Sequence, residues 1–315
     1  MGSRPRKGST GGVVLILLTL LGWSSVTLFL KHFTSYIDAW TANGWRYGMS
    51  ALFWAPVLGW GLWRRTLPDG LWRAALVPSF FNIAAQICFA LAPYYINPGL
   101  IAFLLRLQIV FIAVGAYVLF PAERPVLRSP TYVFGVVIVF TGLMGLCFLG
   151  DTLPRGATAL GIALAVAAGI LYSGYFLGVR YYVHHISPIV SFATISLYTA
   201  TGVVILMLVK GRDHGAGAWS LPWGQFGMLV ASAFAGIAIS HVMYYAAIVR
   251  IGLALCAGVI LVQPVLTSTA SYFLFEERLT LAQWLSGVTA IGGAVILLYT
   301  QRRLAQPPTS PPPPD

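Results

Sequence analysis

The sequence predicts an all-α integral membrane protein whose ten transmembrane helices form two inverted five-helix repeats. Three observations lead to this fold class. The 315 residues are 58% hydrophobic and only 9% charged, whereas soluble domains carry about 25% charged residues. Charge-free runs long enough to span a bilayer follow one another along most of the chain. Polar and aromatic residues of the first half also recur in the second half at a nearly constant spacing.

Segments rich in Pro, Gly, Asn and charge divide the apolar runs into helices. The charge-free run 74–105 is too long for one span, and APYYINPG (92–99) divides it. HHISP (184–188) divides the later apolar region in the same way. The predicted helices cover residues 12–31, 38–63, 72–93, 98–120, 130–149, 157–183, 188–210, 222–249, 253–275 and 281–301.

The distribution of basic residues predicts the direction of the helices. Lys and Arg gather in the cytoplasmic loops of membrane proteins. Most of those between the helices, such as Arg64, Arg124 and Arg180, lie on the side of the two termini, so we expect both termini to be cytoplasmic. This placement also accounts for the net charge of +11 without a nucleic-acid-binding face, which needs basic residues clustered on one folded surface. The chain then divides into a short cytoplasmic segment (1–11), a first repeat (12–149), a second repeat (157–301) and a disordered Pro-rich cytoplasmic tail (302–315).

The repeat is visible in polar and aromatic residues, which match by chance less often than apolar ones in such a composition. Offsets of 149 and 155 residues give these pairs: Gly12 with Gly161, Ser24 with Ser173, Lys31 with Arg180, Gln108 with Gln263, and Tyr117 with Tyr272. Because each copy has an odd number of helices, the second copy enters the membrane from the opposite side. Inverted repeats of this kind recur in secondary transporters, whose substrate sites lie near the midplane between the repeats.

The only adjacent acidic residues, Glu276 and Glu277, lie in the short link before the last predicted helix. Thr280 and Gln283 follow with the spacing of a capping box, and negative charge before a helix start suits the helix dipole. We therefore expect the acidic pair to stabilise the structure rather than take part in chemistry.

Several segments resemble one known family. They are LTLLGWSSVTLFLK (18–31), NGWRYGMSA (43–51), LVQPVLTSTASYFLF (261–275) and FLFEERLTLAQWLSGVTAIGGAVIL (273–297). These segments resemble the EamA-type domains of the drug/metabolite transporter (DMT) superfamily, over residues 12–301. The first repeat departs from the family pattern at Phe-Pro-Ala-Glu-Arg (120–124).

The resemblance implies a basket-like ten-helix bundle around a central cavity, which exports small metabolites by alternating access. The abundance of Trp and Tyr looks closest to the bacterial aromatic amino-acid exporters of the superfamily. The resemblance therefore also implies a bacterial inner (plasma) membrane.

Arg46 and Arg106 lie deep within predicted helices, each about 12 Å from the same membrane surface at 1.5 Å per residue. No Asp or Glu lies at a similar depth to pair with either. A structural interpretation is that the side chains reach the headgroups or cap carbonyls, and that Gly44 and Gly48 beside Arg46 indicate a tight helix contact. The functional interpretation is that one or both attract a substrate carboxylate, with Arg106 the first candidate and Arg46 the second.

Other polar and aromatic residues inside the helices are candidates for contact with a substrate or for plain packing. The amides and the imidazole need partners in lipid and should face the bundle, and the rings could stack on an apolar ligand. Gln108 and Gln263 could equally form a structural hydrogen bond near the symmetry axis. Pro264 removes a backbone donor and can kink its helix. The candidates are Trp23, Gln86, Gln108, Tyr172, Tyr175, His241, Tyr244 and Gln263.

These features predict a secondary transporter that exports small metabolites, above all aromatic or other apolar amino acids. A proton relay through a buried carboxylate has no candidate, which leaves His241 or an interfacial Glu, so we expect facilitative export. The sequence has no nucleotide-binding loop, and Cys88, Cys147 and Cys256 lack the spacing of metal ligands. We therefore expect no cofactor and no metal, only a small-molecule substrate and the bilayer as partners, and the chain is compatible with a monomer. An exporter of drugs or cationic metabolites is the alternative. A membrane-embedded enzyme would need converging catalytic groups, and the sequence offers none.

Overall fold

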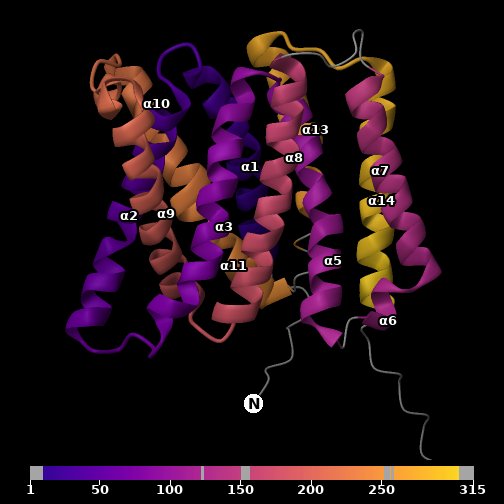
Figure 1. The fold of residues 1–315 in the computed structure, drawn as a ribbon, viewed down its shortest axis with the longest axis horizontal. Coiled ribbons are helices and arrows are strands. Elements are labelled where there is room, and N and C mark those ends of the chain that lie inside the picture. The colour runs from indigo at the N-terminus through magenta and orange to yellow at the C-terminus, as the bar shows by residue number, and fades with distance from the viewer. Residues whose placement is uncertain (1–9, 122–123, 150–156, 252–255, 257–258, 305–315) are drawn as a thin grey trace, which may run out of the picture.

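The computed structural model describes residues 10–121, 124–149, 157–251, 256 and 259–304. Within these ranges the chain is all-helical and forms one bundle of roughly parallel and antiparallel helices (Figure 1). Of the predicted terminal segments 1–11 and 302–315, residues 1–9 and 305–315 lie outside the described residues, whereas residues 10–11 belong to the first helix and residues 302–304 to the last. The main helices are α1 (Thr10–Phe33), α2 (Ala39–Trp63), α3 (Leu71–Leu91), α4 (Pro98–Leu104), α5 (Gln108–Leu119), α7 (Pro130–Phe148), α8 (Ala157–Gly178), α9 (Pro188–Lys210), α10 (Trp223–Ala233), α11 (Ser240–Ile251), α13 (Gln263–Phe275) and α14 (Leu281–Leu304).

Shorter elements continue or link these helices. They are the 3₁₀ segments η1 (Ala92–Tyr94), η2 (Leu105–Leu107) and η5 (Arg212–Ala218), the π-helical segments η4 (Val179–Val183) and η6 (Phe234–Ile239), and the single turn α6 (Arg124–Leu127). Since α4–η2–α5 and α10–η6–α11 each form one crossing, the bundle has about ten crossings, as the sequence predicts.

The second half of the chain runs in the opposite direction to the first. The turn between α1 and α2 marks one end of the bundle, the Lys31 end, and the turn between α2 and α3 marks the other, the Arg64 end. Helix α1 begins at the Arg64 end, whereas α8 begins at the Lys31 end (Figure 1). The predicted inversion is therefore present in the fold.

The helix pairs follow the symmetry of an inverted repeat. Helix α2 packs against α9, α4 against α13 and α7 against α14, and each pair joins corresponding helices of the two halves. Helix α1 packs against α11, and α3 packs against α8; a two-fold axis exchanges these two pairs. Every principal contact thus combines one helix from each half, so the space between the repeats is surrounded by both.

Side chains at the Lys31 end fix the helix starts that the sequence predicts. Asp38 caps α2 by accepting from the N–H groups of Trp40 and Thr41, both at 3.0 Å. Thr280 and Gln283 form the reciprocal capping box of α14, at 3.1 and 3.0 Å. Glu277 pairs with Lys31 at 3.1 Å. The acidic link is therefore structural, and it ties α13 to the end of α1.

Most predicted helix boundaries agree with the structure to within a few residues, but four predicted helices are less regular than expected. The predicted helix 98–120 is interrupted by η2, and 222–249 contains the π-helical η6. The predicted helix 157–183 ends in the π-helical η4, and 253–275 contains a turn at 261–262, after which α13 begins. Irregular backbone in a membrane is tolerated where it is buried in protein or lines a cavity, and η2, η6 and the turn at 261–262 all lie beside the cavity described below.

Six of the described helical stretches are long and apolar enough to cross a membrane, and two shorter apolar helices, Pro130–Leu146 and Leu281–Leu297, accompany them. Helix α2 does not meet this measure. It carries Thr41, Asn43, Arg46 and Ser50, all buried in the bundle. Its low hydropathy therefore reflects polar groups that face other helices rather than lipid.

Glycines allow α7 and α14 to touch along their backbones. A Cβ atom at Gly142 would lie 2.4 Å from the backbone N of Ala290, and one at Gly293 would lie 2.7 Å from the backbone N of Val139. Such contacts join helices without a hydrophobic driving force, through close packing.

We expect Gly293→Ala to destabilise the protein by about 1–3 kcal/mol, the usual cost of overpacking, because the obstructing atoms belong to the backbone of α7. The neighbouring Gly292→Ala is the matched control, since a Cβ there meets nothing within 4 Å. Thermal unfolding in detergent measures both. A melting temperature for Gly293→Ala equal to that of Gly292→Ala would contradict the backbone contact.

Candidate functional site

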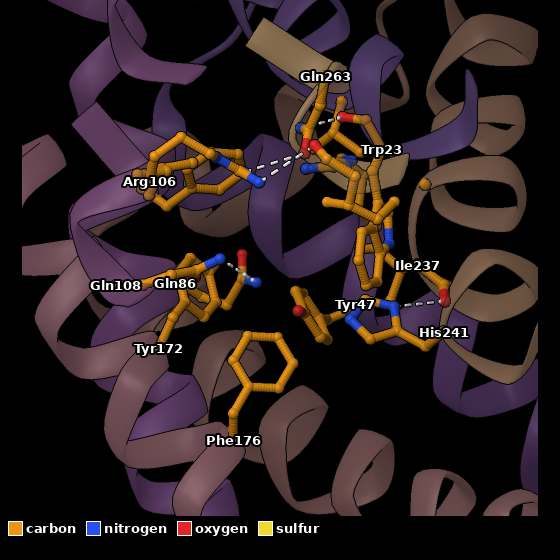
Figure 2. A pocket seen from close by; sticks show the side chains of 16 residues that line it. Trp23, Tyr47, Gln86, Arg106, Gln108, Tyr172, Phe176, Ile237, His241 and Gln263 are labelled. Atoms are coloured by element: carbon orange, nitrogen blue, oxygen red, sulfur yellow. Dashed lines mark hydrogen bonds between the residues drawn. The ribbon is translucent and has the colours of Figure 1, made fainter. Parts of the chain in front are cut away.

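A cavity lies between the two repeats, and side chains from seven crossings surround it. Its volume is about 100 Å³, whereas one water molecule needs only about 10–15 Å³, so it is more than a packing defect. Figure 2 shows the rings and polar groups directed toward one central space. The lining residues are Trp23, Val26, Arg46, Tyr47, Gln86, Phe89, Leu105, Arg106, Gln108, Tyr172, Phe176, Gly236, Ile237, His241, Ile260 and Gln263.

The structure brings together all but two of the candidate site residues. Trp23, Gln86, Arg106, Gln108, Tyr172, His241, Gln263 and Arg46 all line the cavity. The other two lie outside it. Tyr175 is buried beside α3 and α9, with its hydroxyl 3.0 Å from that of Tyr245, and Tyr244 packs behind Trp23 with ring centroids 4.8 Å apart.

Several lining residues were missed by the sequence analysis, although helical spacing could have found some of them. Phe176 follows Tyr172 by four residues, and Ile237 precedes His241 by four, and such residues share a helix face. Tyr47 has no comparable signal, because it is one of 15 tyrosines and only the crossing of α2 and α9 places it.

Arg106 lies in η2 and its guanidinium is held on every side. Its Nη2 donates to Oε1 of Gln263 at 3.0 Å, its Nη1 to the carbonyl of Ile260 at 3.4 Å, and its Nε to the carbonyl of Ala102 at 3.3 Å. Gln263 in turn donates to the carbonyl of Trp23 at 3.0 Å (Figure 2). Arg106 is 5% exposed, so it does not reach to the headgroups. It joins the first repeat to the second.

Arg46 is also buried but only partly satisfied. Its Nε donates to Oγ of Ser232 at 3.0 Å, and the side chain is 0% exposed. Neither Nη1 nor Nη2 has a hydrogen-bond partner among the described residues. An Arg at the bilayer centre costs about 2.5–3.5 kcal/mol on insertion scales, so the protein carries this cost without pairing the charge itself. The alternative of snorkelling is excluded for Arg46 too.

Two further polar side chains of the lining, His241 and Gln86, have hydrogen-bond partners of their own. His241 donates from Nδ1 to the carbonyl of Ile237 at 3.0 Å and stacks on Phe192 with centroids 4.8 Å apart. Gln86 donates to the hydroxyl of Tyr172 at 2.6 Å. A hydrogen bond between Gln108 and Gln263, which the sequence left open, does not form, because Gln263 bonds to Arg106 and Trp23 instead.

The charges of the cavity have one sign. Arg46 and Arg106 line it, and none of its lining residues is Asp or Glu. The acidic residues in the described part of the chain lie in links or at helix ends; they are Asp38, Asp69, Asp213, Glu276 and Glu277. Among the described residues there is also no cluster of three or more His, Cys, Asp or Glu that could hold a metal ion. The cavity thus suits a ligand rich in hydrogen-bond acceptors.

Comparison with known proteins is decisive for the family. The sequence profile of the EamA-like transporter family matches residues 10–148 and again residues 159–299. The chain belongs to the EamA-like transporter family. It is therefore a multi-pass membrane transporter of the DMT superfamily and not an enzyme.

No curated protein matches the chain. Among solved structures, one described as "Crystal structure of protein" resembles this EamA transporter with a TM-score of 0.63 and 17% sequence identity. The similarity covers 95% of this chain and 100% of the other. At this identity the likeness concerns the fold alone.

Both EamA repeats contribute to the cavity, nine lining residues from the first and seven from the second. Trp23, Gln86 and Arg106 come from the first matched segment, and Tyr172, His241 and Gln263 from the second. Relative movement of the repeats would therefore change the shape of the cavity directly.

We expect Gln263→Ala to lower the stability of this EamA transporter by about 1.5–3 kcal/mol, the usual contribution of a hydrogen bond to a charged group, because Arg106 loses its side-chain partner. Gln108→Ala is the matched control at the equivalent position of the other repeat, where the side chain makes no hydrogen bond within the described part of the chain. Thermal unfolding in detergent compares the two. Equal losses would show that the Arg106–Gln263 bond does not hold the repeats together.

Proposed function

We propose that this EamA transporter exports amino acids with aromatic or other apolar side chains, with both termini in the cytoplasm of a bacterial cell. The observation that carries the proposal is a cavity that combines aromatic rings with buried guanidinium groups. Trp23, Tyr47, Tyr172 and Phe176 offer faces and edges for an aromatic side chain, an arrangement worth about 0.5–1.5 kcal/mol for each ring pair. A guanidinium group can hold the carboxylate through paired hydrogen bonds.

The absence of an acidic residue from the cavity lining argues for facilitative transport. Proton-coupled carriers place Asp, Glu or His chains inside the membrane. His241 is the only such lining residue, and its Nδ1 is bonded to a backbone carbonyl. The substrate gradient would then drive export, without proton coupling through a buried carboxylate.

Contacts at the Lys31 end support alternating access, because they join the two repeats. Lys31 pairs with Glu277 at 3.1 Å, the indole N–H of Trp45 donates to the carbonyl of Gly215 at 2.8 Å, and His32 lies 2.5 Å from the amide oxygen of Gln225. We place this end on the outer side of the membrane. Release of substrate there would require these contacts to part.

Reversal of one charge of the Lys31–Glu277 pair should slow transport, since closure of the Lys31 end would meet repulsion. Exposed pairs contribute only about 0.2–1 kcal/mol, so we expect Lys31→Glu to lower the exchange rate by less than about tenfold. The double variant Lys31→Glu/Glu277→Lys should recover most of the loss. Exchange rates in proteoliposomes measure this, and a double variant slower than both single variants would contradict a role for the pair in closure.

Counterflow in proteoliposomes tests the proposed substrate. Vesicles loaded with unlabelled phenylalanine should take up labelled phenylalanine, with the same result in the presence and absence of a pH gradient. Trp23→Ala should reduce the uptake about tenfold, the equivalent of 1.4 kcal/mol, because a ring that lines the cavity is lost.

The matched control is Trp223→Ala, since Trp223 is 90% exposed at the start of α10. It should leave counterflow unchanged. Uptake of a labelled quaternary amine without any uptake of phenylalanine would instead favour the alternative, an exporter of drugs or cationic metabolites.

A further inference from the structure

We infer that Arg46, rather than Arg106, is the anchor for a substrate oxyanion, and that the cavity selects organic anions. An aromatic carboxylate without an ammonium group then binds at least as tightly as the amino acid. This inference rests on the proposed function for the aromatic part of the ligand. It widens the substrate class from amino acids to aromatic carboxylates, and it assigns recognition of the negative charge to Nη1 and Nη2 of Arg46.

Four polar atoms of the cavity lining have no hydrogen-bond partner among the described residues, namely three nitrogen donors and the hydroxyl of Tyr47. Nη1 and Nη2 of Arg46 and Nε1 of Trp23 are buried and have no hydrogen-bond partner among the described residues. Both side chains line the cavity. Each Nη carries two N–H groups and cannot accept, and an indole nitrogen also only donates. A ligand that satisfies the two Nη atoms of Arg46 must supply two acceptors close together, as the oxygens of a carboxylate do.

The hydrogen bonds of the two arginines distinguish their roles. The three nitrogens of the Arg106 guanidinium donate to Ala102, Ile260 and Gln263. Three of its five N–H groups are thus engaged, so each terminal nitrogen has only one N–H left, and the bonds to Ile260 and Gln263 hold the guanidinium across the repeats. In Arg46 only Nε donates, to Ser232. Both terminal nitrogens remain for a bidentate contact with a ligand. The arginine that the sequence ranks second is thus the better anchor.

The backbone beside Arg46 leaves room for this contact. Gly236 lies in the π-helical η6, and a Cβ atom there would stand 3.4 Å from Nη2 of Arg46 and 2.6 Å from Cγ2 of Val26. Single π-helical turns are frequent at functional sites. Gly236 therefore lets η6 pass close to Val26 and to the guanidinium, where a Cβ atom would collide with Val26 and touch Nη2.

The cavity offers no counter-charge for an ammonium group. No acidic residue is among its lining residues, and the Oε1 atom of Gln263 already accepts from Arg106. Two guanidinium groups in one buried space repel a cation, and the repulsion is weakly screened there. A ligand with a net negative charge therefore suits the cavity better than a zwitterion, and a zwitterion better than a cation.

Three probes with one ring test this order: 3-phenylpropanoate has only the carboxylate, phenylalanine has both groups, and 2-phenylethylamine has only the amine. Binding to the purified, detergent-solubilised full chain is measured by titration of the melting temperature, which does not depend on transport. We expect 3-phenylpropanoate to bind at least as tightly as phenylalanine, and the amine to bind at least tenfold more weakly. Phenylalanine that binds more tightly than 3-phenylpropanoate, or an amine that binds as tightly as 3-phenylpropanoate, would overturn the inference.

Two variants locate the anchor. Arg46→Gln should weaken the binding of 3-phenylpropanoate at least tenfold, and Arg46→Lys should restore only part of it, because Lys keeps the charge but lacks the planar fork. Arg64→Gln, at an exposed position, is the control and should bind as the wild type does. Unchanged affinity in Arg46→Gln would overturn the inference. Should Arg46→Gln fail to fold, Gly236→Ala provides the decision, since it narrows the space beside Nη2 and should also weaken binding.

Failure of the aromatic assignment is distinguishable from failure of the anion site. If none of the three probes shifts the melting temperature, the aromatic assignment falls, and acetate and inorganic phosphate become the probes. A shift by either that Arg46→Gln abolishes would retain the anion site. No shift by either would overturn it.

Discussion

A polar group inside a bilayer must find its partner within the protein, because lipid offers none. The two buried arginines of this chain differ in how far the protein satisfies their N–H groups. Each of the three guanidinium nitrogens of Arg106 donates a hydrogen bond, and two of these bonds cross from one repeat to the other. Arg46 is bonded at Nε alone. Three irregular segments of the bundle lie next to these side chains or their partner: η2 contains Arg106, η6 passes Arg46, and the turn at 261–262 precedes Gln263. The helices are irregular near the carbonyls that accept from Arg106, and where Gly236 passes Arg46.

The inverted repeat explains how residues so distant in sequence meet. Trp23 and Gln263 are separated by 240 positions, yet they are hydrogen-bonded. This follows from the pairing of each helix with one of the other half, and from glycines that let backbones approach, such as Gly236 beside Val26. The Lys31–Glu277 pair closes the same interface at one end. The cavity thus lies in the interface between the repeats. A movement of one repeat against the other changes the shape of the cavity and the Lys31–Glu277 contact together.

Much of this could be predicted from the sequence, because membrane helices are encoded by runs of apolar residues and by their breaks. The capping box at Thr280, the start of α9 at Pro188 and the meeting of Trp23, Arg106 and Tyr172 are examples. What the sequence could not give depends on tertiary contacts. The π-helical η6 has no local signal, Tyr47 is one aromatic residue among many, and the ranking of the two arginines required their hydrogen bonds. Tyr175 and Tyr244 lie well inside predicted helices, but their side chains contact Tyr245 and Trp23 instead of lining the cavity.

An experimental structure with 3-phenylpropanoate bound, at a resolution that defines the guanidinium of Arg46, tests the account most directly. The account predicts carboxylate oxygens within about 2.7–2.9 Å of Nη1 and Nη2, the distance of charge-assisted hydrogen bonds, with Arg106 still bonded to Gln263. A carboxylate bound to Arg106 with Gln263 displaced, or an Arg46 whose terminal nitrogens are paired with protein carbonyls, would contradict it.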